Sequence, residues 1–181
     1  MAIAIFGGSF DPPHAGHVAV VERALQELPV DTLYVVPAYV NPFKSGTHAP
    51  PELRRKWLER IFENRSRVRV SDFESGKGRP VATIETVRHF RQIDPDIYLI
   101  IGSDNLESLS KWHEFETLDR LVTWVVATRG NHKGDGTFRF LDVDVDVSST
   151  ELRSLEKTHL IPDAVRDEIE NYYKDIMCKN D

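Results

Sequence analysis

Residues 3–17 read Ile3-Ala4-Ile5-Phe6-Gly7-Gly8-Ser9-Phe10-Asp11-Pro12-Pro13-His14-Ala15-Gly16-His17. Four apolar residues, Ile3–Phe6, predict a short buried strand that ends at two glycines. The next run, His17–Leu28, carries apolar residues at nearly helical spacing. The order of strand, glycine-rich turn and helix is typical of the first unit of an α/β domain.

The rest of the chain repeats this alternation. Short apolar runs predict strands at Thr32–Val36, Val68–Val70, Tyr98–Ile101 and Leu121–Thr128. Amphipathic runs predict helices at Leu53–Phe62, Thr83–Ile93 and Phe115–Leu121, a helix capped by Ser148-Ser149 through Leu155, and a last helix that starts at Pro162-Asp163. Continuous apolar strands between helices indicate a parallel sheet covered on both faces. We therefore predict one α/β domain over residues 1–181, with a doubly wound, mostly parallel sheet.

Composition narrows the function classes. The chain has 181 residues and a formal net charge of −6, which disfavours non-specific binding to nucleic acid. The single cysteine, Cys178, excludes an internal disulfide framework and fits a cytoplasmic protein. No apolar run approaches the roughly 20 residues that span a bilayer, so we expect no membrane partner. The sequence leaves open whether the chain forms a homo-oligomer.

The segment after the first predicted strand has the chemistry of an anion site. Ligands of doubly wound sheets bind at the carboxyl ends of the strands, and Gly7 and Gly8 allow a ligand close to the backbone. His14 and His17 lie where the next helix begins, where free N–H groups and the helix dipole favour an anion. The alternatives are a turn with a capping histidine, or a metal site of Asp11 and both histidines that lacks a third soft ligand.

A second segment with similar chemistry, Val147–Arg153, follows the last predicted strand. Hydroxyl groups and free N–H groups stand at a helix start, and Arg153 lies one turn further on. Together they would suit a polyphosphate. The alternative is an ordinary serine cap with a solvated arginine.

These two segments resemble the paired signatures of the nucleotidyltransferase superfamily that carries the HxGH motif. Further segments are similar to the bacterial nicotinate-nucleotide adenylyltransferases, in the same order along the chain: Val36-Pro37 with Asn41–Lys44, Thr83–Val87, Ile101–Leu106 with Lys111–His113, and Ile161–Val165. The resemblance covers nearly the whole chain. It implies a Rossmann-like nucleotidyltransferase fold, in which the two signatures close on one ATP.

The activity that the resemblance implies is transfer of AMP from ATP to nicotinate mononucleotide. The products are nicotinate adenine dinucleotide and pyrophosphate, in NAD biosynthesis. The attacking phosphate is already an anion at neutral pH, so the reaction needs no general base and no covalent intermediate. The protein has to align two anionic phosphates and spread the charge on the α-phosphoryl oxygens. Mg²⁺ is expected to arrive with ATP, without a dedicated protein site, because it tends to keep its waters.

The resemblance also assigns roles residue by residue. The implied catalytic residues are His14, His17 and Arg153, with His17 nearest the α-phosphorus. The residues implied to bind ATP are Gly7, Gly8, Ser9, Phe10, His14, His17, Gly102, Asp104, Ser149, Thr150 and Arg153. The residues implied to bind nicotinate mononucleotide are Gly8, Ser9, Lys44, Thr83, Asp104, Trp112 and Arg129. Trp112 is implied to stack on the pyridine ring, and Thr83 to help bind its carboxylate.

Two positions depart from the family pattern. Many members have a tyrosine where Ala82 precedes Thr83, and Arg-Pro-Gly near Arg129-Gly130-Asn131. Both bear on the choice between an acid and an amide substrate. The open alternatives are therefore an adenylyltransferase that also accepts, or prefers, nicotinamide mononucleotide, and a non-catalytic nucleotide-binding module. A phosphopantetheine enzyme is disfavoured by His14, where that branch usually has threonine.

Three remaining patterns are interpreted structurally. The basic run Arg54–Arg60, with Arg65, Arg67 and Arg69, indicates mostly a solvated helix face. The alternation of valine with Asp142, Asp144 and Asp146 indicates a half-exposed strand more than a metal site. The aromatic residues expected in the core are Trp57, Trp124, Tyr172 and Tyr173.

Overall fold

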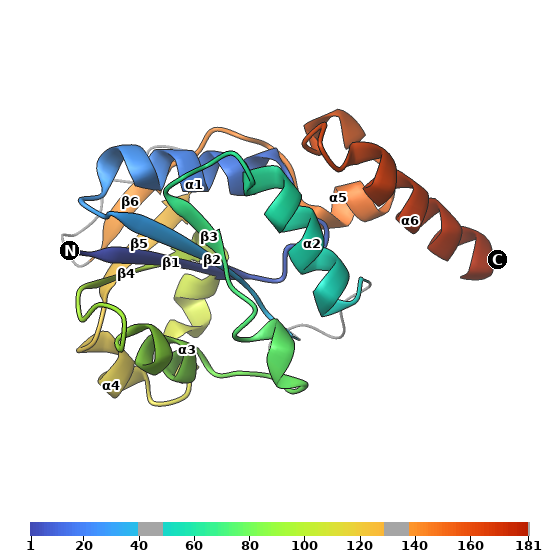
Figure 1. Ribbon diagram of the computed structural model, residues 1–181. Helices are drawn as coiled ribbons and strands as arrows, with labels where there is room; N and C mark the ends of the chain where they lie inside the picture. The colour runs from blue at the N-terminus through green and yellow to red at the C-terminus, as the bar shows by residue number, and fades with distance from the viewer. Residues whose placement is uncertain (40–48, 129–137, 181) are drawn as a thin grey trace.

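The computed structural model describes residues 1–39, 49–128 and 138–180, and its centre is a parallel sheet (Figure 1). The six strands are β1 Ile3–Gly8, β2 Thr32–Pro37, β3 Val68–Val70, β4 Ile97–Gly102, β5 Thr123–Thr128 and β6 Arg139–Asp142. Their order is β3-β2-β1-β4-β5-β6, and every neighbouring pair is parallel. The prediction of a doubly wound parallel sheet is confirmed.

The strand order reverses between β1 and β4, which lie side by side with Phe6 opposite Ile100. Successive side chains of β1 point to opposite faces of the sheet and enter two different apolar clusters. Ala4 and Phe6 join one cluster, and Ile3 and Ile5 join the other. Both faces are thus buried, which explains why the strand has no polar residue.

Helices cover both faces of the sheet. The α-helices are α1 Ala15–Glu27, α2 Pro51–Phe62, α3 Thr83–Phe90, α4 Phe115–Asp119, α5 Ser149–Arg153 and α6 Arg166–Asn180. Short 3₁₀ helices lie at η1 Ser75–Lys77, η2 Ser103–Lys111 and η3 Thr158–Leu160. Helices α1 and α2 pack on the face that Phe6 enters, and α3 and α4 pack on the face that Ile5 enters (Figure 1).

A third apolar cluster joins the end of the chain to the sheet domain. It gathers Trp57 of α2, Leu152 of α5, and Ile169 and Tyr173 of α6. Helix α6 extends beyond α5 at the edge of the molecule (Figure 1). The prediction that Trp57, Trp124 and Tyr173 lie in the core is confirmed, whereas Tyr172 is only half-buried.

Several predicted boundaries differ from the structure. The last helix starts at Arg166 and not at Pro162, because the N–H of Val165 donates to the Pro162 carbonyl in a separate turn. Strand β6 ends at Asp142, but the expected alternation of exposed aspartate and less exposed valine continues through Val147. The 3₁₀ helix after β4 was not predicted. Among the described residues, none of the helices has the length and apolarity required to cross a bilayer.

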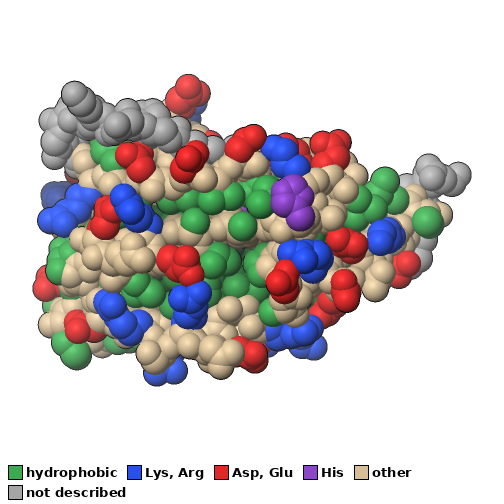
Figure 2. Space-filling view, turned by 90° about the horizontal axis from the view of Figure 1, so that it is seen from above, with side chains coloured by type: hydrophobic (Ala, Val, Ile, Leu, Met, Phe, Trp, Pro, Cys, Tyr) green, Lys and Arg blue, Asp and Glu red, His purple; other side chains and the backbone are tan. Residues whose placement is uncertain are grey.

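Charged side chains of both signs are mixed over the face shown in Figure 2. Arg60 of α2 forms an exposed ion pair with Glu168 of α6, and Arg65, after α2, forms one with Glu22 of α1. These contacts agree with the prediction of a solvated face for most of the basic run. Arg54 is the exception, because its side chain is fully buried.

The packing of α6 predicts that replacing side chains by alanine has unequal effects on stability at two positions of that helix. Ile169 is 0% exposed in the third cluster, so Ile169→Ala should lower the free energy of unfolding by about 2–5 kcal/mol. Met177, on the same helix, is 46% exposed, and Met177→Ala should change it by roughly 0.5 kcal/mol or less. Urea unfolding monitored by tryptophan fluorescence measures both values. Equal effects of the two variants would contradict this packing.

Candidate active site

The loop between β1 and α1 is shaped by an aromatic side chain folded beneath it. Phe10 adopts the left-handed backbone region with φ 50° and is buried. Its ring packs edge-on against Phe6 at 5.3 Å and against the His17 ring at 4.8 Å between centroids. A Cβ atom on Gly8 would lie 3.1 Å from the Phe10 ring, so a side chain at this position would press on that buried ring. The Phe10 side chain is therefore a support, and only its backbone can face a ligand.

The two motif histidines stack on each other at the start of α1. Their ring centroids are 3.7 Å apart, with 22° between the planes. His14 is the N-cap residue and is 6% exposed, whereas His17 is half-buried. A Cβ atom on Gly16 would lie 3.0 Å from the Nδ1 atom of His14, which explains why glycine stands between the histidines.

One hydrogen bond fixes the tautomer of His17. The backbone N–H of His14 donates to the Nδ1 atom of His17 at 3.1 Å. Because Nδ1 accepts, the proton of the neutral ring is on Nε2. His17 therefore carries an Nε2–H donor at the amino-terminal end of a 13-residue helix whose first turn holds no acidic residue. That combination attracts a phosphate oxygen.

The second predicted segment docks directly on this loop. The Arg153 guanidinium donates to the Asp11 carbonyl at 2.7 Å, and the Ser149 hydroxyl donates to the Pro12 carbonyl at 3.2 Å. Arg153 also donates to the Thr150 hydroxyl at 3.0 Å. The structure thus brings together both motif segments, which are more than 130 residues apart in the sequence.

A capping network holds helix α5 in that position. The Ser148 hydroxyl accepts from the N–H of Glu151, and the Glu151 carboxylate accepts from the N–H of Ser148 at 2.8 Å. Lys157 forms an ion pair with the same carboxylate at 2.8 Å. The Lys157 bond, with the Ser148 hydroxyl and N–H bonds, lowers the pKa of Glu151 to about 2. A serine does cap this helix, as the alternative interpretation expected, but that serine is Ser148. Ser149 contacts the loop.

The end of β4 lies beside the loop because β4 pairs with β1. The Asp104 carboxylate is exposed and folds back against Gly102. Asn105 holds this turn by donating to the Gly102 carbonyl at 3.1 Å and to Asp104 at 3.2 Å. Gly102 and Asp104 therefore lie at the same edge of the sheet as Gly7 and Gly8, as the sequence predicted from the strand ends.

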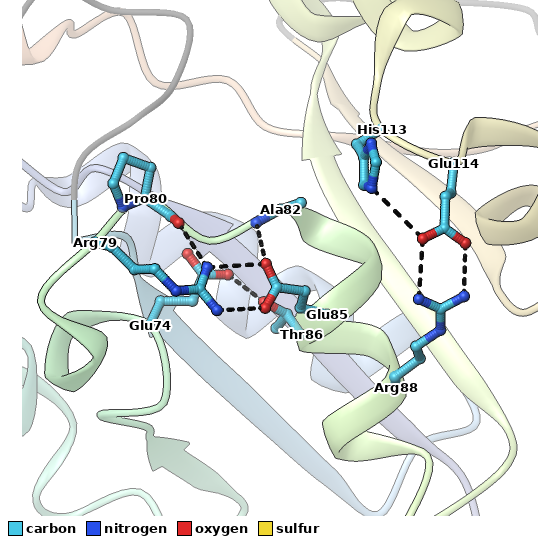
Figure 3. A network of polar contacts seen from close by, with 9 residues as sticks. All are labelled: Glu74, Arg79, Pro80, Ala82, Glu85, Thr86, Arg88, His113 and Glu114. Atoms are coloured by element: carbon cyan, nitrogen blue, oxygen red, sulfur yellow. Dashed lines mark hydrogen bonds and ion pairs between the residues drawn. The ribbon is translucent and has the colours of Figure 1, made fainter.

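The residues predicted to bind the pyridine ring lie on neighbouring elements. Thr83 is the first residue of α3, and Trp112 follows η2, packing edge-on against Trp124 at 6.2 Å. A bidentate ion pair between Arg88 of α3 and Glu114, at 3.0 and 2.6 Å, ties α3 to the N-cap of α4, two residues after Trp112 (Figure 3). Lys44 and Arg129 lie outside the described residues.

A buried carboxyl group beneath α3 was not singled out from the sequence. Glu74 is buried, and its Oε1 atom accepts from the Thr86 hydroxyl at 2.5 Å (Figure 3). Burial raises the pKa of Glu74 to about 7, and the nearby charge of Glu85 adds to this effect. Glu85 itself is paired with Arg79 at 3.1 and 2.7 Å. A glutamate in a polar loop gives no sequence signal for such burial.

The prediction for Arg54 is wrong. It was expected on a solvated face, but its guanidinium is fully buried beside the loop. The spacing contained a signal, because Arg54 lies three and four positions before the buried Trp57 and Leu58 and therefore shares their face.

The donor chemistry of the loop suits phosphate oxygens more than a bare cation. Imidazole and guanidinium N–H groups donate hydrogen bonds and do not ligate metals in that state. Within the described residues, no group of three or more His, Cys, Asp and Glu side chains could hold a metal ion. These donors suit the phosphate oxygens of a nucleotide, and a cation held by those oxygens would need no ligand from the protein.

A comparison with known families places the chain. A sequence model of the family described as cytidylyltransferase-like matches residues 5–155. This chain belongs to that family. The matched range of this cytidylyltransferase-like chain includes both motif segments, α5 and the sheet apart from the first two residues of β1.

Relatives match this cytidylyltransferase-like chain over almost its full length. A protein of a Nitratiruptor species, named "Probable nicotinate-nucleotide adenylyltransferase", is 49% identical over 176 residues, covering 96% of this chain and 99% of the relative. A protein of the same name from Sulfurimonas denitrificans is 44% identical, covering 99% and 98%. The solved structure of Plasmodium falciparum nicotinic acid mononucleotide adenylyltransferase complexed with NaAD superposes with a TM-score of 0.71 at 22% identity, covering 97% and 95%, and shares the fold.

The buried Glu74 predicts a pH dependence of stability with a definite sign. Its pKa is about 7 in the folded chain against an ordinary 4.5, so between these values the folded state binds more protons than the unfolded state. The free energy of unfolding should therefore fall as pH rises from about 4.5 to about 7. Glu74→Gln keeps the acceptor for Thr86 without a charge, so it should be neutral at pH 5. At pH 8 it should stabilise the chain by on the order of 2–3 kcal/mol.

Chemical denaturation at pH 5, 6, 7 and 8 measures this effect. Glu85→Gln is the matched control, because Arg79 lowers the pKa of Glu85 to about 2. Removing this charge breaks an exposed ion pair and should lower the free energy of unfolding instead of raising it. Parallel stability profiles of the wild type and Glu74→Gln across this range would contradict the assignment.

Proposed function

We propose that this chain transfers AMP from ATP to nicotinate mononucleotide, forming nicotinate adenine dinucleotide and pyrophosphate in NAD biosynthesis. The observation that carries the proposal is the docking of the 149–153 segment on the 11–14 loop through Arg153 and Ser149. It gathers imidazole, guanidinium and helix N-terminal donors at one edge of the sheet, as a polyphosphate requires. The names of the near-full-length relatives support the same reaction.

The phosphate-binding residues would act by alignment and charge stabilisation. His17 would donate its Nε2–H to an α-phosphoryl oxygen, and the ring stacked on it, His14, would hold a second phosphate oxygen. Arg153, Ser149 and Thr150 would bind the remaining phosphates as pyrophosphate forms. The acceptor phosphate is an anion at neutral pH, so no side chain needs to remove a proton. Fixed donors placed where charge develops are the main source of acceleration in such reactions.

The loop backbone and the end of β4 would hold the nucleosides. We propose that Gly7, Gly8, Ser9 and Phe10 contact ATP through their backbone, and that Gly102 and Asp104 meet the adenosine ribose. Gly8, Ser9 and Asp104 would also contact the mononucleotide. Trp112 would stack on the pyridine ring and Thr83 would help to bind its carboxylate, with Lys44 and Arg129 as further basic contacts.

Nucleotidyltransferases of this family generally use a divalent cation with ATP. We propose Mg²⁺, held by ATP oxygens without a dedicated protein site, where it would neutralise phosphate charge. A cytoplasmic location and the lack of a nucleic-acid partner stay predictions from the sequence.

Two substitutions separate the donor role of His17 from its capping role. Asparagine keeps an acceptor near the position of Nδ1, which caps the N–H of His14, but removes the Nε2–H donor. His17→Asn should therefore fold with near-normal stability and lose roughly 10²–10³-fold in kcat, by analogy with the loss of one charge-stabilising donor. His17→Gln, which can reach the Nε2 position with an amide N–H, should retain more activity than His17→Asn.

A continuous pyrophosphate assay and thermal denaturation read out these variants. His159→Ala is the control, because that side chain is exposed and lies in η3, outside both motif segments. Near-normal turnover of His17→Asn would show that the Nε2–H donor is not used.

The acceptor preference tests the proposed substrate directly. Pyrophosphate release with ATP and Mg²⁺ should favour nicotinate over nicotinamide mononucleotide by tenfold or more in kcat/KM, a gap of about 1.4 kcal/mol. The N-terminal end of α3 favours a carboxylate over a neutral amide. Equal rates would make this a dual-specificity enzyme, and no release with either acceptor would favour a nucleotide-binding module.

A further inference from the structure

Arg54 is a buried cation that binds backbone carbonyl groups. It is 0% exposed on helix α2, and its guanidinium donates four hydrogen bonds. Nε donates to the Ala49 carbonyl at 2.9 Å, and Nη1 donates to the Ser9 carbonyl at 2.5 Å. Nη2 donates to the Ala38 and Tyr39 carbonyls at 2.8 and 2.9 Å. One side chain thus joins the loop after β1, the end of β2 and the residues that precede α2.

The bond to Ser9 fixes the direction of a peptide group in the nucleotide loop. The C=O and N–H of one trans peptide point in opposite directions. In this loop the cis bond is Asp11-Pro12, and the Ser9–Phe10 peptide is trans. Holding the Ser9 carbonyl against Arg54 therefore turns the Phe10 N–H to the opposite side of the loop, away from α2.

Arg54 is also connected to the second motif segment. The backbone of Ala49 accepts from Arg54 and donates its N–H to Oδ1 of Asp11 at 3.1 Å. The same carboxylate oxygen accepts from the Tyr173 hydroxyl at 2.5 Å, and the Asp11 main-chain carbonyl accepts from Arg153. Removing the positive charge would leave the buried Asp11 carboxylate with less compensation and free to change its contacts.

We propose that Arg54 is a positioning residue for the reaction. It holds the loop of residues 9–11 in the conformation in which the N–H groups of the loop, and Arg153 docked on the loop, meet the nucleotide phosphates. This inference rests on the proposed adenylyl transfer. Arg54 would not touch the substrate itself. Its planar guanidinium reaches three segments at once, whereas a lysine ammonium at this site would be a single point donor.

The variants Arg54→Lys and Arg54→Ala test this role against the neighbouring control Arg55→Ala. Arg55 is on the same helix but forms an exposed ion pair with Glu59 one turn on. We expect Arg54→Lys to keep the wild-type circular dichroism and to lose about 10²-fold or more in kcat, since a misplacement of about 1 Å can have this effect. Arg55→Ala should stay within twofold of the wild type.

Rescue by a small molecule distinguishes positioning from a general loss of packing. Guanidinium at millimolar concentration should raise the kcat of Arg54→Ala at least tenfold, and the increase should saturate with guanidinium concentration. Equal concentrations of NaCl or urea should not raise it. Folded variants that keep kcat within threefold of the wild type would overturn the proposal. Rescue by NaCl to the same extent, or failure of both variants to fold at 10 °C, would also overturn it, because Arg54 would then serve the fold as a whole.

ATP binding keeps this test independent of the proposed reaction. Titration calorimetry of the wild type and Arg54→Lys with ATP and Mg²⁺ should show at least tenfold weaker binding by the variant. If the wild type releases no pyrophosphate, the proposed function fails, while this affinity ratio still decides whether Arg54 positions the loop. Equal affinities would overturn the positioning role.

Discussion

Two buried charges of opposite sign, Arg54 and Asp11, meet at the backbone of Ala49 and fix the loop between β1 and α1. Burying an ion is costly unless hydrogen bonds surround it, and here carbonyl groups surround the cation while an N–H and a hydroxyl reach the anion. Apolar residues of similar volume can give as much stability as such a pair. The additional effect of the charges is geometric, because every carbonyl must point at one guanidinium plane, and few loop conformations satisfy that condition.

The same loop shows how tight packing and chemistry share residues. Phe10 takes a left-handed backbone conformation and lies beneath Gly8, and its ring supports His17. His17 in turn accepts the N–H of His14, so that capping the helix and presenting an Nε2–H donor are one arrangement. The reversal of strand order between β1 and β4 then places this donor at the edge where Asp104 emerges. Local sterics and sheet topology therefore converge on a single edge.

Local structure could be predicted from the sequence, but the burial of charged side chains could not. Ile3–Phe6 and Tyr98–Ile101 are apolar at every position, which led to the correct parallel sheet. The first motif segment was correctly expected at a strand end, whereas the second begins at Val147, beyond the end of β6 at Asp142. Arg54 was assigned to solvent because charged side chains are almost never fully buried unless they have partners, and its partners are main-chain carbonyls without a residue-specific pattern. The burial of Glu74 was missed because a glutamate in a polar loop gives no signal for it, and the bond from Tyr173 to Asp11 was missed because it joins residues far apart in the sequence. The start of α6 was misplaced because Pro162 suits both a helix start and a turn.

The departure at Ala82 is less severe than the loss of a tyrosine suggests. Ala82 is the N-cap of α3 and packs against the apolar cluster beneath it, and its N–H donates to Glu85 at 3.4 Å. A glutamate at this place would by itself oppose a substrate carboxylate at the helix N-terminus. Arg79 holds Glu85 with two hydrogen bonds and neutralises its charge, so the positive end of the helix dipole stays effective. We propose that an acid-selective site here rests on the backbone of α3 and on this ion pair, without the tyrosine that the family resemblance implies.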